Sequence, residues 1–320
     1  MLDQEPEIST RPLAQLLVIA GLAMLGILIF SGLGLAAMRF WLPEAGSSPQ
    51  GFPNLQALGS DGRTALLLVQ GLTQLGGFLV FPMFVYLLLP GTSFEPKYSI
   101  SPNLTILLLI VGLAMLMMPV NSWLATLNQS VQLPSFLKGF EKWAHDRESE
   151  TEQLTLFLVD FDNPAQAVLG FVVIAGIAGI TEEYFFRKLV QPRIFGLTSN
   201  IHLAVWMTAF IFSAIHVQFL GLIPRMALGA LFGYYYVWTG NIRLAMFGHF
   251  LNNSITLAGI YLYRLEISPI NVEDPQQIPW YLGPLAAGVT WSLSVMVKDE
   301  ADKIRSRKKQ LVQVENRSNF

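Results

Sequence analysis

The sequence has no cysteine and little charge. Only 13% of its 320 residues are charged, whereas soluble domains usually carry about 25%. Without cysteine there can be no disulfide, no thiolate metal site and no cysteine nucleophile. The net charge of -2 gives no sign of a nucleic-acid partner. With 52% hydrophobic residues and a mean hydropathy of +0.48, the chain is expected to lie mostly in a lipid bilayer.

The N-terminal segment lacks the marks of a cleaved signal peptide. Met1 to Ser9 is acidic, and only Arg11 precedes the first apolar stretch. That stretch runs far beyond the roughly 7–15 residues of a signal sequence. We therefore expect a first spanning helix at this point.

Eight apolar stretches approach the length of about 20 residues that a spanning helix needs. They are residues 13–37, 65–89, 103–124, 166–187, 202–220, 223–239, 243–263 and 280–297. Gly/Pro signals at 42–43, 90–91, 221–225, 240–241 and 268–269 separate several of them, and the third predicts a tight hairpin. The predicted fold class is all-α, a polytopic membrane bundle of about eight transmembrane helices.

The basic residues orient this bundle. The tail from Lys298 is rich in lysine and arginine, which favours the cytoplasm. Eight spans then place the N-terminus there too, and the connections 125–165 and 264–278 on the outside. We expect an integral membrane protein with both termini cytoplasmic.

The long connection at 125–165 has a pattern of its own. Phe136, Phe140 and Trp143 recur at i, i+4 and i+7, and acidic residues follow them. This favours a short amphipathic helix lying on the membrane interface. A lid over the entrance of a site is the alternative.

The fourth stretch ends in three charges. Ala167 to Ile180 has no charge, and Glu182, Glu183 and Arg187 follow. Each charge costs roughly 2.5–3.5 kcal/mol at the centre of a membrane helix, so a functional site is indicated. Glu183 and Arg187 are spaced i, i+4 for an ion pair, which leaves Glu182 free to face elsewhere. Solvated charges at a helix end are the alternative.

Two further motifs lie on later stretches. Phe212-x-x-x-His216 lies near the end of the fifth, and His249-x-x-x-Asn253 lies within the seventh. Each alone could be structural, as a packing histidine or as a hydrogen bond between helices. His145 and His202 are expected to lie outside any site. Three glycines are expected to serve close helix packing and a turn: Gly229, Gly233 and Gly240.

The three motifs together favour water activation, because bundles build their sites from side chains on facing helices. A buried carboxylate can act as a general base near neutral pH, and a histidine can hold the same water or donate a proton to a leaving amine. His249 and Asn253 could stabilise an oxyanion. This predicts amide hydrolysis without a covalent enzyme intermediate.

A catalytic zinc ion is the competing way to activate water. Glu182, His216 and His249 would be a three-ligand set with one open position. The His-Glu-x-x-His pattern of soluble metalloproteases is absent. A glutamate-dependent mechanism without a metal is favoured, and zinc stays open.

These motifs, in this order on membrane helices, resemble the CPBP family. It comprises the CAAX prenyl endopeptidases and the bacterial Abi group, with bacteriocin-processing and immunity proteins. The segment Arg225 to Asn253 is also similar to the family, and the resemblance covers about residues 150–260. With its bacterial relatives, it implies the bacterial inner (cell) membrane as the location, and it divides the chain into three parts. These are N-terminal spans and the external connection (1–165), a catalytic core (166–263), and the last span with the basic tail (264–320).

The resemblance implies an intramembrane protease that acts on a membrane protein or peptide. In it, Glu182 and His216 would activate water, and His249 and Asn253 would stabilise the oxyanion. The residues that would shape the site or bind substrate are Glu183, Arg187 and Phe212. Family members are described both as metalloproteases and as glutamate proteases. Two other readings are a non-catalytic immunity or scaffold protein on the same fold, and a proton-coupled transporter.

Overall fold

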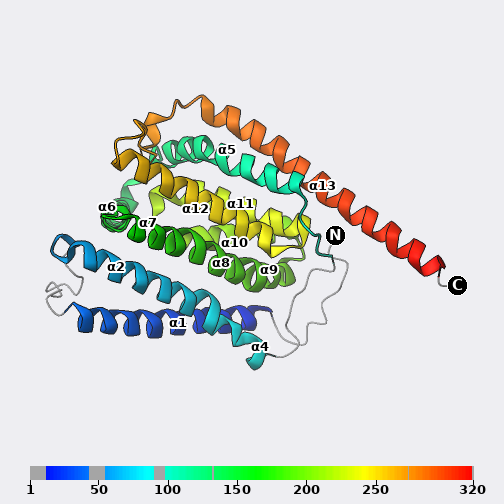
Figure 1. The fold of residues 1–320 in the computed structure, drawn as a ribbon, viewed down its shortest axis with the longest axis horizontal. Helices are drawn as coiled ribbons and strands as arrows, with labels where there is room; N and C mark the ends of the chain where they lie inside the picture. The colour runs from blue at the N-terminus through cyan, green and yellow to red at the C-terminus, as the bar shows by residue number, and fades with distance from the viewer. Residues whose placement is uncertain (1–11, 43–54, 90–97, 132, 273, 319–320) are drawn as a thin grey trace.

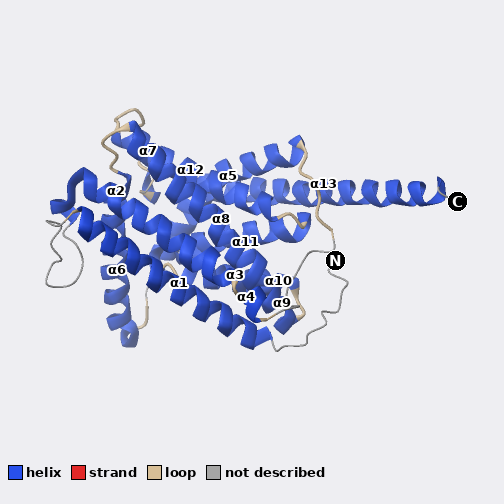
Figure 2. Cartoon of the chain, turned by 60° about the horizontal axis from the view of Figure 1, so that its bottom comes forward, coloured by secondary structure: helices blue, strands red, loops and turns tan. Residues whose placement is uncertain are grey.

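The computed structural model describes residues 12–42, 55–89, 98–131, 133–272 and 274–318. The acidic segment 1–9 and the turn signals at Pro43 and Pro90–Gly91 lie outside the described residues. Helices and loops make up the described part, and no strand occurs within it (Figure 2). The all-α prediction is confirmed for these residues.

The described residues form eight helical passes that run side by side and reverse direction at each connection (Figure 1). They are α1 (Pro12–Trp41), the interrupted helix α2–α4 (Leu55–Gln74, Phe81–Met83, Val85–Leu88), α5 (Leu104–Gln129), the run α7–α9 (Pro164–Thr198), α10 (Ile201–Ala214), α11 (Leu222–Thr239), α12 (Ile242–Arg264) and α13 (Leu282–Ser318).

The bundle has two ends with different connections. The start of α1, the α9–α10 and α11–α12 turns and the second half of α13 lie at one end, which we call the tail end (Figure 1). Helix α6 (Lys138–Val159), the α10–α11 turn and the α12–α13 connection lie at the other, the α6 end. Both predicted external connections thus lie at the α6 end, opposite the basic tail.

Four of the described helices are long and apolar enough to cross a membrane, by length and composition. They are Pro12–Trp41, Leu58–Leu88, Leu104–Gln129 and Pro164–Thr198. The other four predicted stretches are helical but more polar or shorter. The predicted stretch 202–220 is too long, because α10 ends at Ala214 after 14 residues. The chain then turns, with Val217 in the left-handed region at φ 56°.

The fourth pass differs from a regular α-helix. It contains two π-helical segments, Phe171–Ile177 and Tyr184–Val190, on either side of α8 (Ala178–Glu183). Such segments are rare and occur frequently at functional sites. The two adjacent glutamates at the end of α8 therefore lie between two changes of helical register, which the sequence pattern did not predict.

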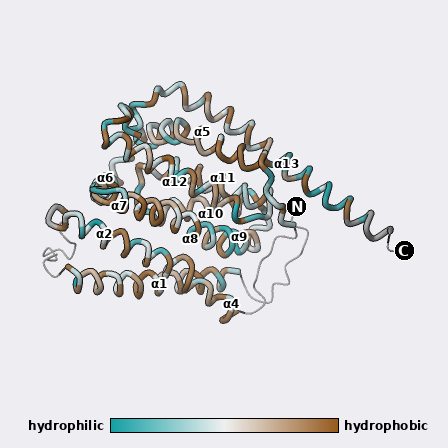
Figure 3. The backbone as a smooth tube through the Cα atoms, viewed as in Figure 1, coloured by the Kyte–Doolittle hydropathy of each residue, from teal (hydrophilic) through white to brown (hydrophobic). Residues whose placement is uncertain are grey.

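Helix α6 crosses the end of the bundle. It is seen nearly end-on in Figure 1 and runs across the direction of α1 and α2 in Figure 2. The helix predicted within 125–165 is therefore present, and Phe136 lies just before it in a 3-10 turn, Ser135–Leu137. At the tail end, α13 projects beyond the other helices, and its projecting half is hydrophilic (Figure 3).

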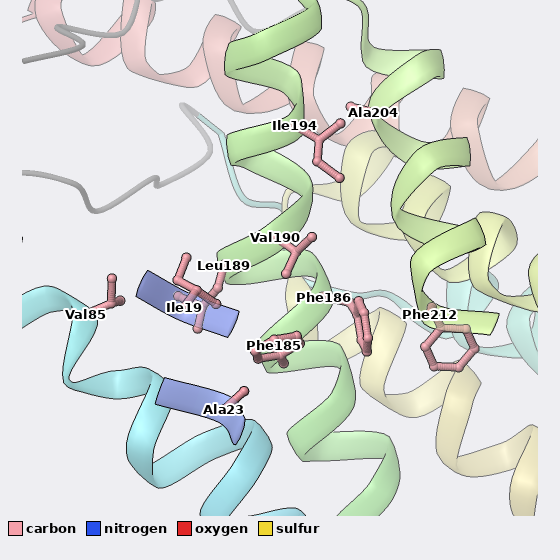
Figure 4. Packing of buried hydrophobic residues seen from close by; sticks show 10 residues of the cluster. All are labelled: Ile19, Ala23, Val85, Phe185, Phe186, Leu189, Val190, Ile194, Ala204 and Phe212. Carbon is pink, nitrogen blue, oxygen red and sulfur yellow. The ribbon is translucent and has the colours of Figure 1, made fainter. Parts of the chain in front are cut away.

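Two hydrophobic clusters hold the passes together. The first joins α1, α4, α9 and α10 through residues that include Ile19, Val85 and Phe186 (Figure 4). Phe212 of α10 also belongs to this cluster. The second joins α5, α11, α12 and α13 through residues that include Ile110 and Phe232. Phe212 and Phe232 lie at the edges of the two clusters, and both also line the cavity between them.

The predicted roles of the three glycines are confirmed. A Cβ atom at Gly229 would lie 3.0 Å from Phe212 Cδ1, and one at Gly233 would lie 2.9 Å from Gln191 Oε1. Gly240 ends α11 in the left-handed region at φ 63°. Side chains would therefore separate α11 from α10 and α9, and they would strain the α11–α12 turn.

Candidate active site

A cavity of about 600 Å³ lies within the bundle and reaches the α6 end. Its walls come from α2, α5, α6, α8, α10, α11 and α12. The structure brings five of the predicted site residues to this one cavity: Glu182, Phe212, His216, His249 and Asn253. The other two, Glu183 and Arg187, lie behind its wall and are fully buried.

Glu183 connects an arginine to a histidine. Its Oε2 accepts a hydrogen bond from Arg187 Nε at 2.8 Å, as the i, i+4 spacing predicts. Its Oε1 lies 3.0 Å from His249 Nδ1. Because Arg187 keeps the carboxylate charged, Glu183 accepts this bond and His249 carries its proton on Nδ1. The Nε2 atom of His249 is then left for the cavity.

Aromatic rings fix the plane of His249. Phe232 stacks on the imidazole with centroids 4.9 Å apart and planes inclined by 17°, and Phe212 meets it edge-on at 5.8 Å. The Arg187 guanidinium lies 5.8 Å from the centre of the Phe212 ring. Hydrogen bonding and ring packing therefore hold one imidazole in one orientation, which pre-organises a site.

Glu182 faces the cavity while its neighbour Glu183 does not. The Glu182 side chain is 9% exposed, and its Oε2 lies 3.9 Å from His249 Nε2. That separation is too long for a direct hydrogen bond, and it is a distance at which one water molecule can bridge the two groups. The structure thus separates the two adjacent glutamates, as the helical angle between them predicts.

His216 lies in the turn after α10, and not in a helix. Its Nδ1 lies 2.7 Å from the Phe212 carbonyl oxygen, so this nitrogen donates and Nε2 keeps its lone pair when the ring is neutral. Asn128 of α5 holds the turn, since it donates to Phe219 O and accepts from Ile223 N. The Nε2 atom of His216 is therefore presented to the cavity by a turn that Asn128 holds on its C-terminal side.

Asn253 uses a carbonyl made available by the first π-helical segment. The Ala178 N–H bonds to Ala175 O and Val173 O, and not to Ile174 O four residues back. Asn253 Nδ2 donates to that Ile174 oxygen at 3.1 Å. Asn252 Nδ2 donates to Asn253 Oδ1 at 3.4 Å. One N–H of the Asn253 amide thus fixes the side chain, and the second is available to the cavity.

Sequence reasoning missed three groups around this site. Arg225 of α11 lines the cavity and attracts the carboxylates of Glu148 and Glu182. Phe232 stacks on the His249 ring. Glu148 of α6 accepts a hydrogen bond from Leu220 N at 3.3 Å. An arginine within a membrane hairpin is a signal that could have been used. No local sequence pattern predicts the stacking of Phe232 on His249, because the two residues lie on different helices.

The zinc alternative does not fit the described geometry. Among the described residues, no group of three His, Asp or Glu side chains could hold a metal ion. Glu182, His216 and His249 share one cavity without forming such a set. Nδ1 of each histidine has a partner, so each ring presents Nε2 to the cavity. The proposed reaction uses the side chains alone.

The fold and this site define an all-helical bundle with apolar spans and buried glutamate and histidine side chains. Comparison with known sequences finds a family that matches part of the chain. Residues 164–255 match the family described as "Type II CAAX prenyl endopeptidase Rce1-like". The chain therefore carries an Rce1-like CAAX prenyl endopeptidase (CPBP) family domain over these residues, as the motifs predict.

Two curated proteins from Bacillus subtilis are similar to parts of the chain. The chain is 27% identical over 132 residues to a protein described as "Putative membrane peptidase YdiL". It is 29% identical over 83 residues to "Uncharacterized protein YpbD". These matches cover 41% and 25% of this chain, and 49% and 39% of the relatives, so the chain spans less than half of each relative's length. No solved structure gives a significant match.

Proposed function

We propose that this protein is an intramembrane endopeptidase that hydrolyses a peptide bond of a membrane-associated protein or peptide. One observation supports this proposal most directly. The Glu182 carboxylate and Nε2 of His249 lie close together in a cavity within a bundle that has apolar spans. The family domain over residues 164–255 supports the same class of reaction.

In the proposed reaction, water attacks the carbonyl carbon of the substrate. Glu182 takes a proton from that water, and Nε2 of His216 holds it in place. The carbonyl oxygen becomes an oxyanion, which receives hydrogen bonds from Asn253 Nδ2 and from Nε2 of protonated His249. The proton on Glu182 then moves to the leaving amine as the C–N bond breaks, which restores the carboxylate.

Glu183 and Arg187 act through His249 in this proposal. Glu183 fixes the ring and stabilises its protonated form, and Arg187 keeps Glu183 charged. The arrangement is analogous to the carboxylate that orients histidine in serine proteases.

We further propose that all eight passes cross the membrane, with the tail end in the cytoplasm. Several polar residues within α11 and α12 face the cavity, as Arg225 and His249 do, so these helices need not expose them to lipid. The charged residues Arg243 and Arg264 lie at the two ends of α12. The cavity then opens towards the outer face of the membrane, under α6. Substrates would enter from that face or from the bilayer.

The test is proteolysis in reconstituted vesicles with the membrane proteins of the host cell as substrates. Wild type is compared with Glu182→Ala, with and without a zinc chelator, and Glu150→Ala on the exposed side of α6 is the matched carboxylate control. We expect products that Glu182→Ala loses, that Glu150→Ala retains and that the chelator leaves unchanged. Identical products from a folded Glu182→Ala variant would favour a non-catalytic immunity or scaffold protein.

A further inference from the structure

Three amide side chains line the cavity outside the family-matched region. Gln70 and Gln74 come from α2, and Asn121 comes from α5. The spacing i, i+4 places the two glutamines on one face of α2. None of the three has a role in the proposed reaction.

The carbonyl oxygens of these amides are left without partners. Gln70 Oε1, Gln74 Oε1 and Asn121 Oδ1 are each buried, and none accepts a hydrogen bond within the described structure. Buried polar atoms are usually paired, and an unpaired one calls for an explanation. Three unpaired oxygens that belong to side chains lining one cavity indicate a ligand that brings hydrogen-bond donors.

Close packing places this wall beside the catalytic pass. A Cβ atom at Gly71 would lie 3.3 Å from Val173 Cγ2, so α2 lies directly against the first π-helical segment. Ile174 in that segment, like Glu182 at the end of α8, lines the same cavity. A molecule held by the amides can therefore extend to the proposed reacting groups.

The spacing of the glutamines fits an extended peptide. Residues four apart on an α-helix are separated by about 6 Å along its axis. In an extended chain, N–H groups on the same edge recur every second residue, at about 6.6–6.8 Å. Gln70 and Gln74 can therefore accept hydrogen bonds from two N–H groups on one edge of the chain.

We propose that Gln70, Gln74 and Asn121 form a subsite for the backbone of an extended peptide. Their carbonyl oxygens accept its N–H groups and position the chain along the cavity. This subsite rests on the proposed function, because its ligand is the segment to be cleaved. Backbone recognition of this kind tolerates many side-chain sequences, since it reads a group that all residues except proline carry.

The experiment measures peptide binding separately from cleavage. Glu182→Gln protein in vesicles is given a mixed-sequence pool of acylated decapeptides, and a second pool with N-methylated backbones. The same pools are given to Glu182→Gln protein that also carries Gln70→Leu and Gln74→Leu. Thr73→Val is the matched control on α2, since the Thr73 hydroxyl donates to Val69 O in its own helix. Bound peptides are quantified by mass spectrometry.

We expect the glutamine substitutions to weaken binding about fivefold to fiftyfold, as loss of two neutral hydrogen bonds would. N-methylation should weaken binding to the intact subsite by a similar factor and have little further effect on the double leucine variant. Thr73→Val should bind as the parent does. The proposal is overturned if N-methylation weakens both proteins equally, if the leucine variant binds as well as the parent, or if the intact subsite retains no peptide.

This result is independent of whether the protein cleaves peptides. Suppose that Glu182→Ala leaves the cleavage products unchanged, but N-methylation weakens peptide binding only when Gln70 and Gln74 are present. The endopeptidase proposal then fails and the subsite remains. If cleavage depends on Glu182 but the effect of N-methylation does not depend on the two glutamines, only the subsite proposal fails.

Discussion

Two buried arginines organise two different clusters in this molecule. Arg187 lies in the bundle behind the cavity, and Arg63 of α2 lies at the α6 end. Arg63 donates to Asp160, to Asp162, to Gln166 and to the backbone of Phe157. Its two aspartates are half-exposed, at 55% and 50%. Arg187 has one carboxylate partner, and both groups of that pair are fully buried.

The clusters differ in how completely their hydrogen bonds are satisfied. Arg63 has an acceptor for all three of its nitrogens. Gln166 beside it also bonds to Ser60 and Thr64. Arg187 leaves Nη1 buried without a partner, and its carboxylate partner is shared with His249. The first cluster ties α2 to the α6–α7 connection, whereas the second holds a histidine whose other nitrogen faces a cavity.

The burial of a charged group alone therefore does not distinguish a structural ion-pair cluster from a functional site. An ion pair becomes a functional candidate where it orients a further titratable side chain and where that side chain reaches a cavity. The glutamate and histidine beside Arg187 meet both conditions. Asp160 beside Arg63 also pairs with Arg264, but neither of these side chains lines the cavity.

The largest difference is expected when each arginine is removed. Arg187→Met leaves the Glu183 carboxylate buried without its cation, and loss of one partner of such a pair costs about 3–5 kcal/mol. Arg63→Met should cost less, about 1–3 kcal/mol, because water can reach its aspartates and the main loss is of hydrogen bonds. Reversible denaturation of both variants in detergent measures this. Equal losses would mean that the two clusters have the same structural role.

The next largest effect is expected on cleavage. Glu183→Gln keeps the shape of the side chain but removes the charge that orients His249, and loss of such a partner costs about 10–100-fold in activity. The fall should lie in kcat, with KM little changed. Asp160→Asn is the matched change in the Arg63 cluster and should leave kcat unchanged. A loss of kcat in Asp160→Asn would contradict the division between the clusters.

A smaller effect is expected from the aromatic neighbours. Phe232 stacks on His249, and Phe157 lies 5.0 Å from the Arg63 guanidinium. Phe232→Leu should lower kcat by about two- to tenfold, since aromatic pairs contribute about 0.5–1.5 kcal/mol. Phe157→Leu should change the unfolding midpoint and leave kcat unchanged. A normal kcat in folded Phe232→Leu would show that Glu183 alone fixes the ring.

Local spacing explains what the sequence could predict. The Glu183–Arg187 pair depends only on helical periodicity, and the helical passes follow from the length of apolar stretches. Three motifs on separate helices predicted the shared cavity, because polar side chains in a membrane bundle face inward. The catalytic roles of Glu182, His216, His249 and Asn253, and the division into parts at 165 and 263, stay predictions.

What could not be predicted depends on partners far away in the chain. The π-helical segment at Phe171–Ile177 provides the Ile174 carbonyl to Asn253, which lies 79 residues later. Val217 takes a left-handed conformation that β-branched residues disfavour, so no turn signal marked the end of α10. Gln70 and Gln74 look like ordinary polar residues until their helix is placed against the cavity.

The smallest expected effect concerns α6, which joins the two regions. Its C-terminal end leads to Asp160 in the Arg63 cluster, and its middle reaches the cavity through Glu148. Burial raises the pKa of the Glu148 carboxyl, and the Leu220 N–H and Arg225 only partly oppose the shift. Docked α6 therefore binds a proton more tightly than undocked α6, in which a glutamate has a pKa of about 4.3.

The sign of the pH effect follows from this difference. Docking takes up a proton, so it should weaken as the pH rises from about 4.3 through the raised pKa of Glu148. The change should be below about 1 kcal/mol, because water screens the half-buried carboxylate. Hydrogen-exchange protection of the α6 amides, corrected for intrinsic rates, measures it. Glu148→Gln should remove the dependence, while His145 and Glu152 remain as neighbouring titratable groups. If protection instead rises with pH, the ion pair with Arg225 outweighs burial, and α6 is held by charge as the Arg63 cluster is.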